Sequence, residues 1–116
     1  MANAFKNAGV AIGATATTIY QTPIGVNSSV VHSIYIANID GTNAATVNIE
    51  VSTDGAGSGS FFHVAKTVQV PADSSLILDK PVNLFNTNNA SAGDLMRATA
   101  SAASRLEAFI SILEIS

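Results

Sequence analysis

The sequence predicts an all-β fold, a single antiparallel β-sandwich of the jelly-roll or Ig-like kind with about eight short strands. Two observations predict it. Apolar and polar residues alternate with period two, most clearly in AATVNIEVS at residues 44–52, which is typical of a strand with one buried face. Turn signals recur roughly every 8–12 residues, the spacing of a sandwich or jelly roll. No window shows sustained helical periodicity with caps.

The expected strands follow one another at short spacing. They are AGVAIG (8–13), TTIYQTP (17–23), SVVHSIYIANI (29–39), AATVNIEVS (44–52), SFFHVAKTVQVP (60–71), SSLILDKPVNLF (74–85), DLMRATAS (94–101) and RLEAFISILEIS (105–116). The Ala and Leu content near the end is compatible with a helix, but Phe109, Ile110 and Ile112 favour a strand.

Two Gly-containing linkers are expected to close hairpins. DGTN (40–43) holds the Asp-Gly pair that favours a tight turn, with Gly41 at positive φ, so the runs on either side should be antiparallel neighbours. DGAGSGS (54–60) resembles a phosphate-binding loop only loosely, because no Lys-Ser/Thr and no helix follow it. We interpret it as a hairpin tip.

A chain of 116 residues has the size of one domain. We divide it into an N-terminal arm, residues 1–9, and a β-sandwich domain, residues 10–116. The arm is rich in small residues and carries one aromatic, Phe5. We expect Phe5 to enter a pocket of a neighbouring molecule as the arm orders on binding.

Charge is scarce in this chain. Charged residues make up 11% of the sequence, against about 25% in a typical soluble domain. Such a surface suits a protein packed against neighbours, where each buried charge would be costly. The five bases form no basic run, so we expect no nucleic-acid binding. Cysteine is absent, and no stretch reaches the roughly 18 apolar residues of a membrane helix, so no membrane partner is expected.

The candidate reactive residues form no recognisable site. His32 and His63 lack metal-ligand spacing and each lies within an apolar run. Ser74 and Ser75 lack the frame of a catalytic serine and are better explained as turn residues. We assign no catalytic, cofactor-binding or metal-binding residue and expect no cofactor. Most of the seven aromatic residues are expected in the core, with Phe61 or Phe62 pointing outward.

Five segments together carry a family resemblance. They are MANAFKNA (1–8), TTIYQTP (17–23), VHSIYIANIDGTNAATV (31–47), VPADSSLILDKPVNL (70–84) and TASAASRLEAFISILEIS (99–116). The chain resembles small virion structural proteins, head decoration-like, of tailed bacteriophages that infect cyanobacteria and other aquatic bacteria. The resemblance implies a non-enzymatic β-sandwich that is built into the phage particle in many copies.

We therefore expect a capsid decoration, or cement, protein that binds the outside of the major capsid protein lattice. It would act as a homo-oligomer, a trimer being the favoured form, and reside in the virion after synthesis in the host bacterial cytoplasm. The expected assembly contacts are Phe5, Lys6, Asp79 and Lys80. The alternatives are a neck, tail or fibre-base component, which copy number would separate, and a carbohydrate-binding host-attachment module, which needs an exposed aromatic platform.

Overall fold

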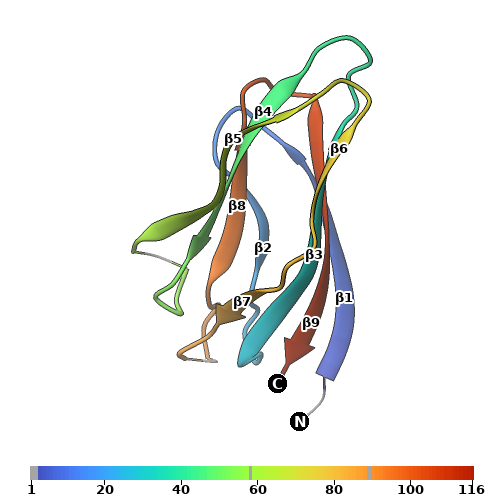
Figure 1. Ribbon diagram of the computed structural model, residues 1–116. Helices are drawn as coiled ribbons and strands as arrows, with labels where there is room; N and C mark the ends of the chain where they lie inside the picture. The colour runs from blue at the N-terminus through green and yellow to red at the C-terminus, as the bar shows by residue number, and fades with distance from the viewer. Residues whose placement is uncertain (1–2, 58, 89) are drawn as a thin grey trace.

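In the part of the chain that the structure describes, nine strands form two sheets that face each other (Figure 1). The structure is a computed structural model and describes residues 3–57, 59–88 and 90–116. The strands are β1 (Asn3–Ile12), β2 (Thr17–Gln21), β3 (Ser28–Asn38), β4 (Ala45–Ser52), β5 (Phe61–Val70), β6 (Ser75–Leu78), β7 (Val82–Phe85), β8 (Leu95–Ala100) and β9 (Leu106–Ile115). Across the described residues, no helix is long and apolar enough to span a membrane.

The strand order is that of a jelly roll. Sheet A has the order β1-β9-β3-β6, with β7 also paired to β3, and sheet B has the order β2-β8-β4-β5. Every pairing is antiparallel. With β6 and β7 counted as one interrupted strand, the sheets hold four strands each, as in an eight-stranded jelly roll. The all-β sandwich prediction is therefore confirmed, and the strand order identifies the jelly-roll form rather than the Ig-like form.

The segment expected as one strand at residues 74–85 is divided into β6 and β7. Both pair with β3, β6 along Ile34–Ala37 and β7 along Ser28–Val31. Between them lies Pro81, which has no N–H to donate to a ladder. The register of β3 against β9 also shifts at this level, so the division coincides with a bulge in β3.

The first strand begins earlier than the sequence indicated. Residues 3–9 were expected to be an arm outside the sandwich, but they belong to β1 and pair in register with β9, from Asn3 opposite Ile115 to Gly9 opposite Phe109. Ladder pairing overrides the weak strand propensity of these residues. Residues 1–2 of the expected arm lie outside the described residues.

The DGTN linker does not close a hairpin, and that prediction is wrong. β3 lies in sheet A and β4 in sheet B, so the linker crosses from one sheet to the other. Gly41 is not among the residues with positive φ. Instead, the Asp40 carboxylate accepts hydrogen bonds from the N–H groups of Thr42 and Asn43, which hold the pKa of Asp40 below its usual range. An Asp-Gly pair supports such an Asx turn equally well.

The core between the sheets is aliphatic. The prediction that most aromatic residues lie in it is wrong, because none of the seven is among the buried apolar residues. Of the two adjacent phenylalanines, Phe61 is the outward one, because its ring lies beside the Arg97 guanidinium on the outer side of sheet B. Phe62 lies opposite Val51, on the other side of β5, and is 59% exposed. The largest fully buried side chains are Ile12, Val31, Ile34, Ile36, Val47, Ile49, Val70, Leu84, Met96, Leu106, Ile110 and Ile112.

A buried carboxylate joins the loops at one end of the sandwich. Asp94 is 1% exposed. Its Oδ1 accepts hydrogen bonds from the Ser52 hydroxyl at 3.0 Å and the Gly55 N–H at 2.7 Å, and its Oδ2 accepts one from the Phe85 N–H at 3.1 Å. These bonds tie the β4–β5 hairpin tip to the end of β7, because a buried carboxylate must find such donors.

A second polar cluster connects the two sheets. The Tyr20 hydroxyl on β2 donates a hydrogen bond to Glu114 Oε2 on β9 at 2.5 Å and lies 2.9 Å from Ser29 Oγ on β3. The Lys6 ammonium is 3.3 Å from Glu114 Oε1. Burial, and then the hydrogen bond to Glu114, raises the pKa of Tyr20 above its ordinary value of 10.0. The neutral phenol therefore acts as the link between the sheets.

Candidate functional site

The outward surface of sheet A, here called the A face, gathers exposed apolar side chains from five strands. Cross-strand pairing places them on one side, since residues directly opposite each other project together. Its large members are Phe5 on β1, Phe109 on β9, Tyr35 on β3, Ile77 on β6 and Phe85 on β7. Phe5 is 80% exposed and Ile77 57%. Such a cluster on a small protein marks an interaction surface.

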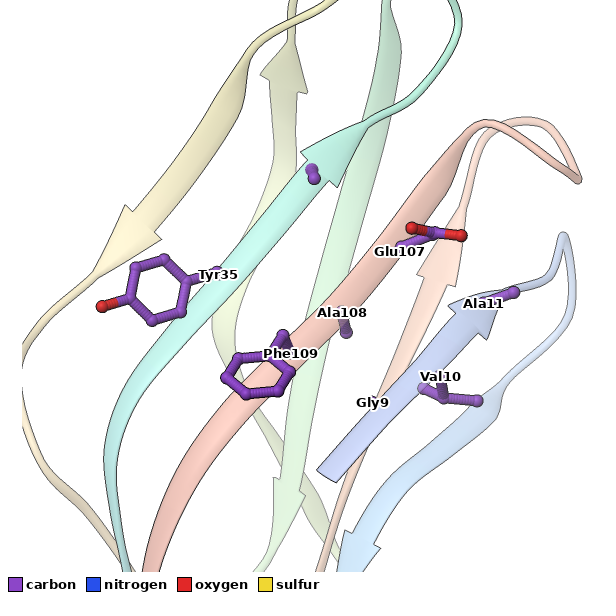
Figure 2. Close-up of a pocket in the computed structure, with 8 residues that line it drawn as sticks. Gly9, Val10, Ala11, Tyr35, Glu107, Ala108 and Phe109 are labelled. Carbon is purple, nitrogen blue, oxygen red and sulfur yellow. The ribbon is translucent and has the colours of Figure 1, made fainter. Parts of the chain in front are cut away.

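A shallow depression of about 380 Å³ lies within the A face. Tyr35 and Phe109 flank it, with ring centroids 6.4 Å apart and ring planes inclined by 45°. Figure 2 shows both rings beside their strands, with Glu107 further along β9 and Gly9 on the adjacent β1. The depression exists because Gly9 and Ala11 present almost no side chain on β1.

The A face is nearly free of charge. Among the outward residues of its strands, all of them described, Glu107 alone carries a formal charge at neutral pH. An apolar partner can cover such a surface without the desolvation cost of stranded ions.

The outward surface of sheet B, here called the B face, has the opposite character. Arg97 Nε is 3.2 Å from Glu50 Oε1, and His63 Nε2 is 3.7 Å from Glu50 Oε2. The Arg97 guanidinium also lies 3.6 Å from the ring centroid of Phe61. These groups already have partners within the chain, and they suit contact with water.

Phe5 and Lys6, two of the expected assembly contacts, point to opposite sides of β1. Phe5 lies opposite Leu113 and belongs to the A face, with its ring 6.1 Å from that of His32. Lys6 lies opposite the buried Ile112 and forms the ion pair with Glu114. Phe5 is therefore available to a partner, whereas the Lys6 ammonium is engaged within the chain.

Asp79 and Lys80, the other two expected contacts, lie at the far edge of sheet A, between β6 and β7. They border a depression of about 260 Å³ whose other walls include Val64, Ile77 and Val82. The structure therefore does not bring the four expected residues together. Asp79 and Lys80 sit across the width of the sheet from Phe5.

The candidate reactive residues also stay apart. His32 is on β3 and His63 on β5, in different sheets. Ser74 lies in the turn before β6, where its N–H bonds the Pro71 carbonyl and its hydroxyl bonds the Ala72 carbonyl. Within the described ranges, no group of three or more His, Asp or Glu side chains could hold a metal ion.

Sequence reasoning missed Tyr35, Phe109 and Ile77 as a surface. A signal was present in RLEAFISILEIS, because Phe109 shares its phase with Glu107 and Ser111 while Leu106, Ala108 and Ile110 occupy the other. An aromatic residue on the polar phase of a strand indicates an exposed ring. The same holds for Ile77, between Leu76 and Leu78.

Comparison with known proteins gives likeness in structure alone, since the sequence matches no family model and no curated protein. Bacillus endospore appendages, described as disulfide-linked pili, align with a TM-score of 0.53 at 18% identity over 99% of this chain and 87% of theirs. The capsid structure of Helicobacter pylori bacteriophage KHP30 aligns with a TM-score of 0.50 at 10% identity over 100% of this chain and 89% of its own. The infectious bursal disease virus particle aligns with a TM-score of 0.57 at 6% identity over 97% of this chain and 31% of its own.

At these identities the comparisons define the fold and no more. The chain has the fold of virus capsid and pilus-like structural proteins. It spans most of the pilus and phage chains, and about a third of the bursal disease virus chain.

Proposed function

We propose that this chain is a non-enzymatic structural protein of a bacteriophage virion, bound as a decoration protein to the outside of the major capsid protein lattice. The A face is the observation that carries the proposal. Five large apolar side chains are exposed on one sheet beside a single formal charge, and an assembled particle is where such a surface becomes buried. Likeness in fold to capsid proteins supports the same role.

The pKa shifts of this chain are consistent with a structural role. Tyr20 is engaged in the inter-sheet cluster and Asp40 in a turn. Neither group borders the A-face depression or the one beside Asp79. The Tyr20 pKa shift follows from burial and then from its hydrogen bond to Glu114, and the Asp40 pKa shift follows from the hydrogen bonds of its turn.

Copy number in purified virions tests the location. Quantitative gel densitometry against the major capsid protein should give hundreds of copies per particle for a decoration protein. A handful or a dozen copies would assign the chain to the neck, tail or fibre base instead. Absence from purified particles would contradict a virion role altogether.

Glycan binding is the second candidate function. The Tyr35–Phe109 pair beside a depression of about 380 Å³ favours it, because sugar faces stack on aromatic rings. Against it, Glu107 and the Tyr35 hydroxyl are the polar side-chain groups that line the depression, whereas a sugar needs several partners. A glycan array decides: specific binding that Tyr35→Ala abolishes would establish this function, and silence would remove it.

A further inference from the structure

We propose that a second copy of this chain covers the A face, related to the first by a two-fold axis that crosses the strands at the level of Asn7 and Ser111. The proposal rests on the proposed use of the A face for assembly and names the partner. It does not require the particle to be a virion.

The outward residues of sheet A form rows across the strands, as the observed pairing shows. One row holds Gly9, Phe109, Tyr35 and Ile77, and another, four residues further along the strands, holds Phe5, Leu113 and Val30. Midway between them lies a row of small polar residues, Asn7, Ser111 and Ser33. The face therefore has a polar middle with an apolar row on either side.

A projection and a hollow lie on the same strand, at equal distances from this middle row. Phe5 projects from β1 with 80% of its surface exposed. Gly9 has no side chain and lines the depression of about 380 Å³. Each is two residues from Asn7, one on either side, and both face outward because the side-chain period of a strand is two.

A two-fold axis through the middle row therefore pairs projection with hollow. Rotation about this axis lays β1 of one copy antiparallel over β1 of the other. Phe5 then meets Gly9 of the second copy, and Gly9 meets Phe5 of the second copy. On β9, the same operation sets Phe109 over Leu113 of the second copy. A symmetric interface needs such self-complementarity, and packed sheets align their strands within about 30°.

The charge distribution allows this arrangement. Glu107 lies in the end row, beyond Phe109, where the rim of an interface stays hydrated. The two-fold operation sets Glu107 of the two copies at opposite ends of the interface. They are eight residues apart in register, about 26 Å at the rise of a strand. The two Glu107 carboxylates therefore do not meet.

The area of the A face is sufficient for a dimer. Four strands of about ten residues cover about 19 Å by 33 Å, or about 600 Å² in projection. Two such faces bury about 1,200 Å², the lower end of the range for specific interfaces. We therefore expect a reversible dimer that the crowded lattice of a particle would reinforce.

Sedimentation velocity on the purified chain tests the proposal. The wild type should dimerise reversibly with concentration. Phe5→Ala and Gly9→Leu should each weaken the dimer at least tenfold, the first by removing the projection and the second by filling the hollow. A Cβ at Gly9 would lie 3.6 Å from Ala108 O and from Phe109 Cδ1, which are ordinary contact distances, and the rest of the side chain would project from the outer side of the sheet, so the variant should fold. Phe62→Ala, an exposed aromatic on β5, is the matched control and should leave the dimer unchanged.

The double variant Phe5→Ala with Gly9→Phe tests the register. It exchanges projection and hollow on the same strand, so the two-fold arrangement predicts partial recovery of the dimer relative to either single variant. Circular dichroism of each variant monitors folding. Additive weakening in folded variants would overturn the proposed register.

Cross-linking gives an independent readout that does not depend on affinity. The chain has no cysteine, so Ser111→Cys introduces a single thiol beside the axis. Sheets pack about 10 Å apart, too far for a disulfide, so a short bismaleimide is the probe. Ser111→Cys should yield covalent dimers, whereas Thr18→Cys on the B face should not.

The outcomes separate this proposal from the proposed function. A wild type that stays monomeric at the concentrations tested and gives no cross-link at Ser111→Cys overturns the dimer, even if the chain is abundant on virions. If capsid shells stripped of the chain then bound it as a monomer, the capsid protein would be the occupant of the A face. A dimer with the expected variant behaviour supports this proposal even if the chain is absent from virions.

Discussion

The two outer faces of this sandwich are built from the same kind of strand, but they differ in whether their exposed side chains find partners within the chain. On the B face, Glu50, Arg97, His63 and Phe61 contact one another. On the A face, large apolar side chains stand beside one carboxylate, Glu107. The fold requires only that the inner side of each sheet be apolar. The outer sides are free to differ, and the apolar one indicates where the molecule meets a partner.

Adding a charge to the A face should have the largest effect. Phe109→Lys leaves the inner side of β9 unchanged, so folding should be preserved, but a partner would have to bury an added ammonium. The affinity of the chain for phage particles should fall about thirtyfold, the effect of losing about 2 kcal/mol at an interface hot spot, and its occupancy of the particles should fall with it. Thr18→Lys on the exposed B face is the matched control. Normal occupancy by the Phe109 variant would show that the A face is not the contact surface.

The next largest effect should come from polar groups buried within the sandwich. Asp94→Ala removes the acceptor of the Gly55 and Phe85 N–H groups and of the Ser52 hydroxyl. Unsatisfied buried donors cost free energy, so the free energy of unfolding should drop by about 3 kcal/mol in urea titrations. Asp79→Ala in the exposed turn between β6 and β7 should change it by about 0.5 kcal/mol or less. Equal effects would contradict the structural role of Asp94.

The hydrogen-bonded link between the sheets at Tyr20 should contribute less to the free energy of unfolding. Tyr20→Phe keeps the ring and removes the hydroxyl that bonds Glu114 and lies 2.9 Å from Ser29. We expect a loss of about 1–2 kcal/mol in the free energy of unfolding, measured by urea denaturation at neutral pH. Lys6 remains 3.3 Å from Glu114 and limits the loss.

The pH dependence of stability distinguishes this link from simple packing. The pKa of Tyr20 is raised in the folded state, so above its ordinary value of 10.0 the unfolded chain ionises first. The contribution of Tyr20 is thus fully present below pH 10 and is lost as pH rises further. Wild-type stability should fall more steeply than that of Tyr20→Phe above pH 10. Parallel curves would show that Tyr20 titrates alike in both states.

The ion pair of the B face should give the smallest effect. A double-mutant cycle on Glu50→Gln and Arg97→Ala should return a coupling free energy below about 1 kcal/mol. The coupling should shrink in high salt because the pair is partly exposed to water. A larger, salt-independent value would mean that the B face is shielded, which would weaken the contrast between the two faces.

The period-two pattern was enough to predict most of the strands, because burial on one side of a sheet imposes it directly, but it missed the start of β1 and the division between β6 and β7. In β9, every second residue from Leu106 to Glu114 is buried. The pairing of β4 with β5 was predicted correctly from the DGAGSGS hairpin tip, but the other pairings could not be predicted. The Asp40 carboxylate satisfies the polar groups of DGTN whether this linker closes a hairpin or crosses between sheets. Only long-range packing decides which of the two connections forms. Residues 3–9 likewise become a strand through β9, which is distant in sequence.

The candidate site was predictable only in part. Phe5 was expected as a contact because it is the one aromatic in a small-residue segment, and it is exposed on the A face. Tyr35, Phe109 and Ile77 belong to different strands, and their common face follows from the register of β3 against β9 and β6. A single sequence does not encode that register locally, so no local pattern reveals the surface as a whole.

The pairing of β1 with β9 also bears on the order of events during synthesis. The two strands are about a hundred residues apart, with Asn3 opposite Ile115. At a ribosomal rate of about 5–20 residues per second, β1 must wait at least several seconds for its partner. The A face, which both strands build, does not exist on a nascent chain until β9 has emerged. If copies associate through this face as proposed, their association can begin only after β9 has emerged.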